Sequence, residues 1–101
     1  MLAIEYTASA EADLTGIVQF TISSWGADQA RNYIKGLERL TTRLAQQPGI
    51  GSQCRDLSAG LRAFPYQSHA IYYLVEPQRL VILRVLHKQM NPSLHVSVED
   101  T

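Results

Sequence analysis

Residues 69–87 decide the fold, and they read HAIYYLVEPQRLVILRVLH. Two apolar runs, 69–75 and 80–87, flank a segment of four residues that contains Pro77. Because proline pre-sets the bend of a four-residue turn, this segment predicts a hairpin that joins two antiparallel strands. Both runs are apolar at odd and even positions alike, which indicates a sheet whose two faces are both covered.

Two further strands are expected outside this hairpin. Residues 61–64 have the composition of a strand, which is expected to end at Pro65. Near the N-terminus, Leu2, Ile4 and Tyr6 alternate with smaller or polar residues, and this alternation predicts a short first strand. The glycine-rich segment 49–60 is expected to be an irregular loop.

Two apolar stripes at three- and four-residue steps predict two helices between these strands. The first stripe contains Ala10, Leu14, Ile17, Val18, Thr21 and Trp25, and the second contains Ala30, Tyr33, Ile34, Leu37, Leu40 and Leu44. Gly26 is placed to end the first helix, and Pro48 disfavours helix before it. The short connection at Gly26 requires an antiparallel helical hairpin. The sequence therefore predicts one α+β domain over residues 1–101, in the order β-α-α-β-β-β, with the hairpin packed on a small antiparallel sheet.

The second face of this sheet needs a cover that a domain of this size does not obviously supply. The helical hairpin covers one face. Residues 88–101 contain Pro92 and an acidic end at Glu99 and Asp100, and beyond about residue 90 they are expected to be flexible or a short helix. Either this tail folds over the second face or a partner chain lays a segment on it, and because the tail is short, with an early proline and an acidic end, the partner is the favoured alternative.

Charge and composition exclude several classes of protein. Nine Lys and Arg residues balance nine Asp and Glu residues, whereas proteins that bind nucleic acid through many phosphates carry a basic excess, so sequence-specific nucleic acid binding is not expected. The N-terminus lacks the features of a signal peptide, and no apolar run approaches the roughly 18 residues of a membrane span. The single Cys54 forms no internal disulfide, which favours a reducing, cytoplasmic compartment. The three histidines and one cysteine lack the spacing of metal ligands, so neither a metal nor another cofactor is expected.

The expected order of elements and six local motifs resemble the ParE branch of the ParE/RelE superfamily, whose members are toxins of bacterial toxin–antitoxin pairs. The motifs are the capped helix opening at 7–14, Trp25-Gly26-x-x-Gln29-Ala30, Leu44-Ala45-x-x-Pro48-x-x-Gly51, Gly60-Leu-Arg-x-Phe64, His69-x-Ile-Tyr-Tyr73, and Ile82-x-Arg-Val-Leu-His-x-x-Met90. Two positions depart from the family, which commonly has arginine where this chain has Ser52 and aspartate where it has Asn91.

This resemblance implies a toxin that acts on the A subunit of DNA gyrase. Such a toxin stabilises cleaved gyrase–DNA complexes and blocks replication as a protein inhibitor, not as an enzyme. The resemblance also implies a ParD-like antitoxin, whose C-terminal segment wraps the toxin as a helix plus an extended strand over the groove between hairpin and sheet.

The candidate contacts with this antitoxin are Arg31, Lys35, Tyr72, Tyr73 and Arg84. Tyr72 and Tyr73 point to opposite faces of their strand, so one is expected in the core and the other at the partner. The residues Trp25, Gly26, Gln29 and Ala30 are expected to form a structural motif, in which Trp25 packs to fix the helical hairpin.

Two alternatives stay open. In RelE-type relatives, basic residues at positions like Arg62 and Arg84 hold the scissile phosphate of messenger RNA on the ribosome, and His87 has the chemistry of a proton shuttle. Against this ribonuclease, a strand arginine usually pairs with a carboxylate, here Asp56 or Glu76, or with loop carbonyls, and a histidine in an apolar strand is usually a hydrogen-bonded core residue. The other alternative is a decayed toxin, retained only as an antitoxin-binding module.

Overall fold

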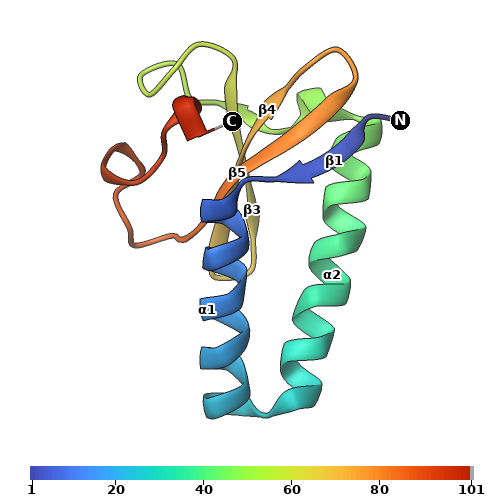
Figure 1. The fold of residues 1–101 in the computed structure, drawn as a ribbon, viewed down its shortest axis with the longest axis vertical. Coiled ribbons are helices and arrows are strands. Elements are labelled where there is room, and N and C mark those ends of the chain that lie inside the picture. Colours follow the sequence, from blue (N-terminus) through green and yellow to red (C-terminus); the bar gives the residue numbers. More distant parts are fainter. Residues whose placement is uncertain (101) are drawn as a thin grey trace.

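A computed structural model describes residues 1–100 and has an α+β fold, as predicted (Figure 1). The strand β1 (Ala3–Tyr6) leads into the helices α1 (Ala8–Trp25) and α2 (Ala27–Gln46). The strands β2 (Ser52–Gln53), β3 (Leu61–Tyr66), β4 (His69–Val75) and β5 (Arg79–His87) follow. Short 3₁₀ turns lie at Pro48–Ile50, Pro92–Leu94 and Val98–Asp100. Neither α1 nor α2 combines the length and the apolar composition that crossing a membrane requires.

The strands form one five-stranded sheet in the order β1-β5-β4-β3-β2. The sheet is mixed and not purely antiparallel, because β1 pairs parallel to β5 and the other neighbours pair antiparallel. The predicted antiparallel sheet is therefore wrong in the pairing of β1, and two further predictions are wrong. Pro65 lies inside β3, where it is tolerated because β2 pairs only with Arg62 and Ala63 and leaves that edge open beyond them. Ser52 and Gln53, expected in a loop, form β2.

Caps at Thr7 and Gly26 position the helical hairpin. The Thr7 hydroxyl accepts from the Ala10 N–H at 3.0 Å and donates to the Leu83 carbonyl at 2.7 Å, so it begins α1 and ties it to β5. Gly26 separates the two helices with a φ of +93°, a conformation that favours glycine. Its N–H donates to the Ile22 carbonyl at 3.0 Å and its carbonyl accepts from the buried Ala30. The predicted hairpin and its break at Gly26 are confirmed.

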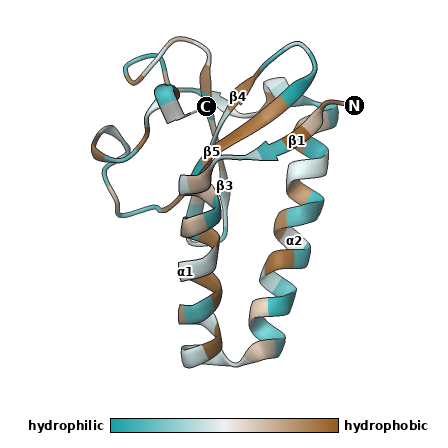
Figure 2. Ribbon diagram, in the orientation of Figure 1, coloured by the Kyte–Doolittle hydropathy of each residue, from teal (hydrophilic) through white to brown (hydrophobic). Residues whose placement is uncertain are grey.

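The main core lies between α2 and the sheet. Its largest fully buried side chains include Leu37, Leu44, Ile71, Tyr73 and Ile82. The strand β5, which is hydrophobic along most of its length in Figure 2, runs through the middle of the molecule.

The chain's own C-terminal tail covers the second face of the sheet, so the favoured expectation of a partner chain there is wrong and the alternative of the tail is confirmed. Leu61, Val81 and Leu83 are no more than 2% exposed on this face. Val96 and Val98 from the C-terminal tail pack against them, beside the loop that precedes β3. The Arg84 guanidinium donates to the His95 carbonyl at 2.8 Å, which fixes the tail after it turns back (Figure 1).

A double substitution tests this cover. Val96→Ala together with Val98→Ala is expected to lower the free energy of unfolding by about 2 kcal/mol, because each change removes two half-buried methyl groups. Urea denaturation measures the change. Leu94→Ala is the control, since Leu94 lies in the same tail with 76% of its surface exposed and should leave stability unchanged. A double variant as stable as the wild type would show that the tail does not cover this face.

Candidate functional site

Helix α1 exposes large apolar side chains that the sequence pattern assigned to the core or left unassigned. Within α1, Ala10 is the one fully buried residue. Phe20 is 68% exposed and Trp25 is 74% exposed, so the prediction that Trp25 packs to fix the hairpin is wrong. Gln29, from the same motif, is also exposed. The last turns of α1 extend past the end of the sheet, so the sheet does not cover this part of the helix (Figure 1).

Two adjoining cavities of about 250 and 320 Å³ follow α1, and we call them together the α1 groove. Both cavities are lined by Ile17, Phe20, His69 and His87. The first continues to Trp25, Gln29 and Tyr33 at the hairpin tip, and the second continues to Gly16, Val85 and Met90. A larger hollow of about 1250 Å³ lies elsewhere, between the N-terminus and the β4–β5 turn. It lacks the exposed aromatic side chains of the α1 groove, which is therefore the stronger candidate for a binding site.

The part of the groove shared by both cavities holds a pair of histidines from neighbouring strands. His69 and His87 pair across β4 and β5, with ring centroids 5.6 Å apart. His69 Nδ1 shares a 3.2 Å hydrogen bond with the Tyr33 hydroxyl. Burial lowers the pKa of His69, and the charge of His87 lowers it further, while Asp13 acts in the opposite direction. The environment of His69 thus favours its neutral form, which suits an apolar ligand. His87 is exposed, not a core residue as expected.

Arg84 is held in a half-buried ion pair that joins distant parts of the chain. Its Nε and Nη2 donate to the two carboxylate oxygens of Asp13 on α1, at 2.7 and 2.8 Å. Asp13 also accepts from the Val85 N–H at 3.0 Å. The prediction that Arg84 pairs with a carboxylate is confirmed, but the carboxylate belongs to Asp13 and not to Asp56 or Glu76. The pairing could not be found from local spacing, because 71 residues separate the two side chains.

Arg62 is hydrogen-bonded to backbone carbonyls of the loop that follows α2. Its Nη1 donates to the carbonyls of Gly51 at 2.7 Å and Gly49 at 3.3 Å. The sequence alternative of bonds to loop carbonyls is therefore confirmed for Arg62. The three residues considered for a nuclease thus have separate surroundings: Arg62 at the 49–51 loop, Arg84 at α1 and the tail, and His87 in the α1 groove.

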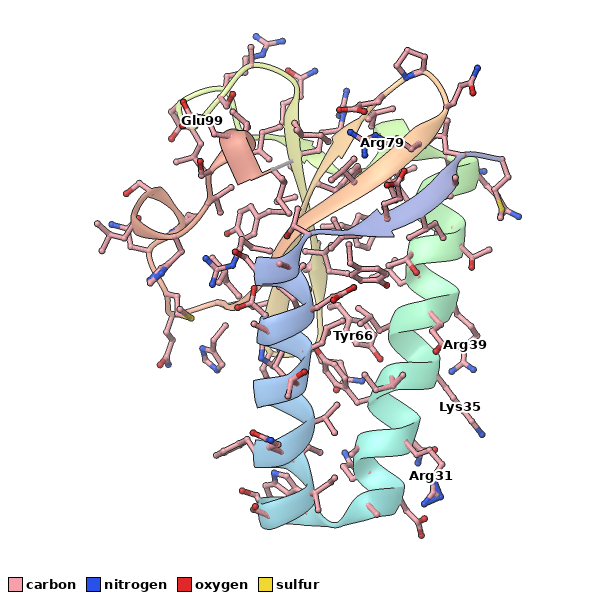
Figure 3. All side chains as sticks on the ribbon, in the orientation of Figure 1. Arg31, Lys35, Arg39, Tyr66, Arg79 and Glu99 are labelled. Carbon is pink, nitrogen blue, oxygen red and sulfur yellow. The ribbon has the colours of Figure 1, made fainter. Side chains whose placement is uncertain are left out.

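The remaining residues proposed for antitoxin contact differ in how far a partner can reach them. Tyr73 is fully buried, where its hydroxyl donates to the Pro48 carbonyl at 2.8 Å and accepts from the Gly51 N–H at 2.9 Å. Tyr73 is therefore the core member of the tyrosine pair. Tyr72 is half-buried on the opposite face, beside the tail-covered cluster. Arg31 and Lys35 are exposed and point away from α1 along the outer side of α2 (Figure 3).

The sequence of α1 contains a pattern that indicates the α1 groove. Apolar residues occur on all sides of α1, including Phe20 and Ile22 outside the assigned stripe. A helix that is apolar all round must be buried on more than one side. Since the sheet covers only one side of α1, the apolar residues outside the assigned stripe indicate a second contact surface.

Comparisons with known proteins agree with this architecture. Residues 4–92 match the family described as the ParE toxin of type II toxin-antitoxin system, parDE. Toxin ParE1 of Caulobacter vibrioides is 37% identical over 87 residues, which are 86% of this chain and 90% of that protein. Toxin ParE of Escherichia coli is 36% identical over 92 residues, which are 90% of this chain and 89% of that protein. Toxin ParE1 of Mycobacterium tuberculosis is 34% identical over 84 residues, covering 82% of this chain and 86% of that protein.

A solved structure shares the fold. A chain of the chromosomal ParDE TA system from P. aeruginosa superposes with a TM-score of 0.73 at 20% identity, over 86% of this chain and 96% of that chain. Fold and sequence together place the protein in the class of toxins from type II toxin–antitoxin systems. Within this class the chain belongs to the ParE toxin family.

Proposed function

We propose that this ParE family toxin inhibits DNA gyrase in the cytoplasm, acts on its A subunit and blocks replication without being an enzyme. Membership of the ParE family is the observation that carries this proposal. The resemblance of the motifs to those of the ParE branch supports gyrase over the ribosome as the target. The balance of nine basic and nine acidic residues also supports a protein target over a nucleic acid.

The bonds of Arg62 and Arg84 further favour gyrase inhibition over messenger cleavage. A ribonuclease of the RelE type needs basic side chains that face the scissile phosphate. Here Arg62 donates to the Gly51 carbonyl and Arg84 donates to the Asp13 carboxylate. Turning either guanidinium towards RNA would break these bonds and leave buried polar groups without their partners.

The proposal includes neutralisation by a ParD-like antitoxin that binds in the α1 groove. Phe20 and Trp25 are large apolar side chains that solvent reaches in the free toxin, and a partner that covers them removes this surface from water. Arg31 and Lys35 on the outer side of α2 suit acidic residues of the same antitoxin. Tyr72 remains a proposed contact near the tail, whereas the guanidinium of Arg84 is held by the Asp13 carboxylate and the His95 carbonyl.

A supercoiling assay tests the gyrase proposal. Purified toxin free of antitoxin is expected to abolish supercoiling of relaxed plasmid by gyrase. Toxin first mixed with the purified product of the neighbouring reading frame is expected to have no effect. Phe20→Asp should keep inhibiting gyrase in the presence of this product, because a charge in the α1 groove opposes an apolar partner.

Two results would contradict the proposal. One is unimpaired supercoiling at a stoichiometric excess of folded toxin over gyrase. The other is the appearance, by primer extension on translated messages, of cuts inside the ribosomal A site. That second result would establish the ribonuclease alternative. Harmless expression of the toxin alone, with tight binding to the antitoxin, would instead favour the decayed toxin.

A further inference from the structure

Gly16 lies in the interior of α1, and no contact within the described chain explains why a glycine stands there. Glycine destabilises a helix interior more than any residue except proline. Gly26 is explained by its φ of +93°. Gly36 and Gly51 are explained by tyrosine hydroxyls that would lie 2.2 Å from an added Cβ atom. At Gly16 an added Cβ would meet no atom of the described chain within 4 Å. The absence of a side chain there serves no internal contact.

Gly16 lies in the wall of the α1 groove. It lines the larger of the two cavities, one helical turn before Phe20 and near His87 and Met90. A Cβ atom on Gly16 would take up space that is open in the free toxin. Glycine at such a place lets another backbone approach the helix closely, because the distance between packed helices depends on the side chains at their contact.

The shape of the groove fits one helix of a partner. Along α1 the two cavities are centred about five residues apart, roughly 8 Å at the rise of an α-helix. Ile17 and Phe20 line both cavities, so the two cavities adjoin along this turn of α1. A helix that carries two large apolar side chains on one face, one to two turns apart, can place one in each cavity.

We propose that Gly16 determines which antitoxin the groove accepts, because a residue without a side chain lets the backbone of a partner helix pack directly on α1. The inference rests on the proposed function, in which the groove receives a ParD-like antitoxin. The family description names such a pair, which favours the antitoxin over a second copy of this chain as the occupant. Gly16 thus gives up helix stability in the free toxin for close contact in the complex.

Gly16→Ala separates these two roles. The variant is expected to melt at a higher temperature than the wild type, since alanine is the better helix former. Its affinity for the purified product of the neighbouring reading frame, measured by titration calorimetry, is expected to fall about tenfold or more, because one added methyl group strains a packed contact. Thr15→Ala is the matched control. Thr15 is the exposed neighbour of Gly16, it lines neither cavity, and its change to alanine also favours helix.

Four results would overturn the role proposed for Gly16. Equal affinity of Gly16→Ala and the wild type would overturn the role of Gly16 while leaving antitoxin binding intact. So would an equal loss of affinity in Thr15→Ala. If the wild type does not bind the product at all, the proposed antitoxin fails and the inference fails with it. A wild-type dimer by light scattering that becomes a monomer in Gly16→Ala would assign the contact to a second copy of the toxin instead.

Discussion

Asp13→Asn is expected to lower the free energy of unfolding by about 3 kcal/mol, since it removes the negative charge from a half-buried ion pair. The Asp13 carboxylate accepts from Arg84 twice and from the Val85 N–H once. The two side chains are 14% and 18% exposed, so water cannot replace the lost bonds fully. An asparagine of the same shape would also turn an N–H donor towards the guanidinium. The loss extends beyond α1, because Arg84 also holds the tail through the His95 carbonyl.

Chemical denaturation measures the free energy of unfolding of Asp13→Asn and of a control variant, Asp28→Asn. Asp28 pairs with Arg31 at 3.3 Å, but its side chain is 96% exposed, and an exposed pair contributes little to stability. Asp28→Asn is therefore expected to unfold like the wild type within error. If Asp13→Asn is equally stable, the Arg84 pair does not hold α1, β5 and the tail together.

Elements set by local chemistry could be predicted from the sequence. The β4–β5 hairpin followed from two apolar runs around Pro77, and the break between the helices followed from Gly26, which adopts a φ of +93°. In both places the signal and its consequence lie within a few residues. Such signals do not depend on how the rest of the chain packs.

Contacts between distant segments could not be predicted in this way. The cover of the second sheet face depends on Val96 and Val98, and their position depends on the bond from Arg84 to the His95 carbonyl. Arg84 in turn is oriented by Asp13. Trp25 has the spacing of a core residue but is exposed, because α1 extends past the end of the sheet, and helical spacing does not show how far the sheet extends. The α1 groove was missed for the same reason, because exposure is a property of the assembled fold.

Gly51, in the loop between α2 and β2, has no room for a side chain, because a buried tyrosine lies against it. An added Cβ on Gly51 would lie 2.2 Å from the Tyr73 hydroxyl oxygen and 2.8 Å from two carbons of its ring. Tyr73 is fully buried and donates to the Pro48 carbonyl, so its ring cannot swing away. The Gly51 N–H also donates to the same hydroxyl. Any shift of this loop therefore costs both packing and hydrogen bonds.

Gly51→Ala is accordingly expected to lower the free energy of unfolding by about 3 kcal/mol, the sum of overpacking and a lost buried hydrogen bond. Urea denaturation should show a lower midpoint with an unchanged slope. Gly49→Ala is the control in the same loop, because its added Cβ would meet no atom of the described chain within 4 Å. Tyr73→Phe removes the hydroxyl, so the double variant with Gly51→Ala should lose less stability than the two single changes added together. Simple additivity of the two changes would mean that the Tyr73 hydroxyl is not what excludes a side chain at position 51.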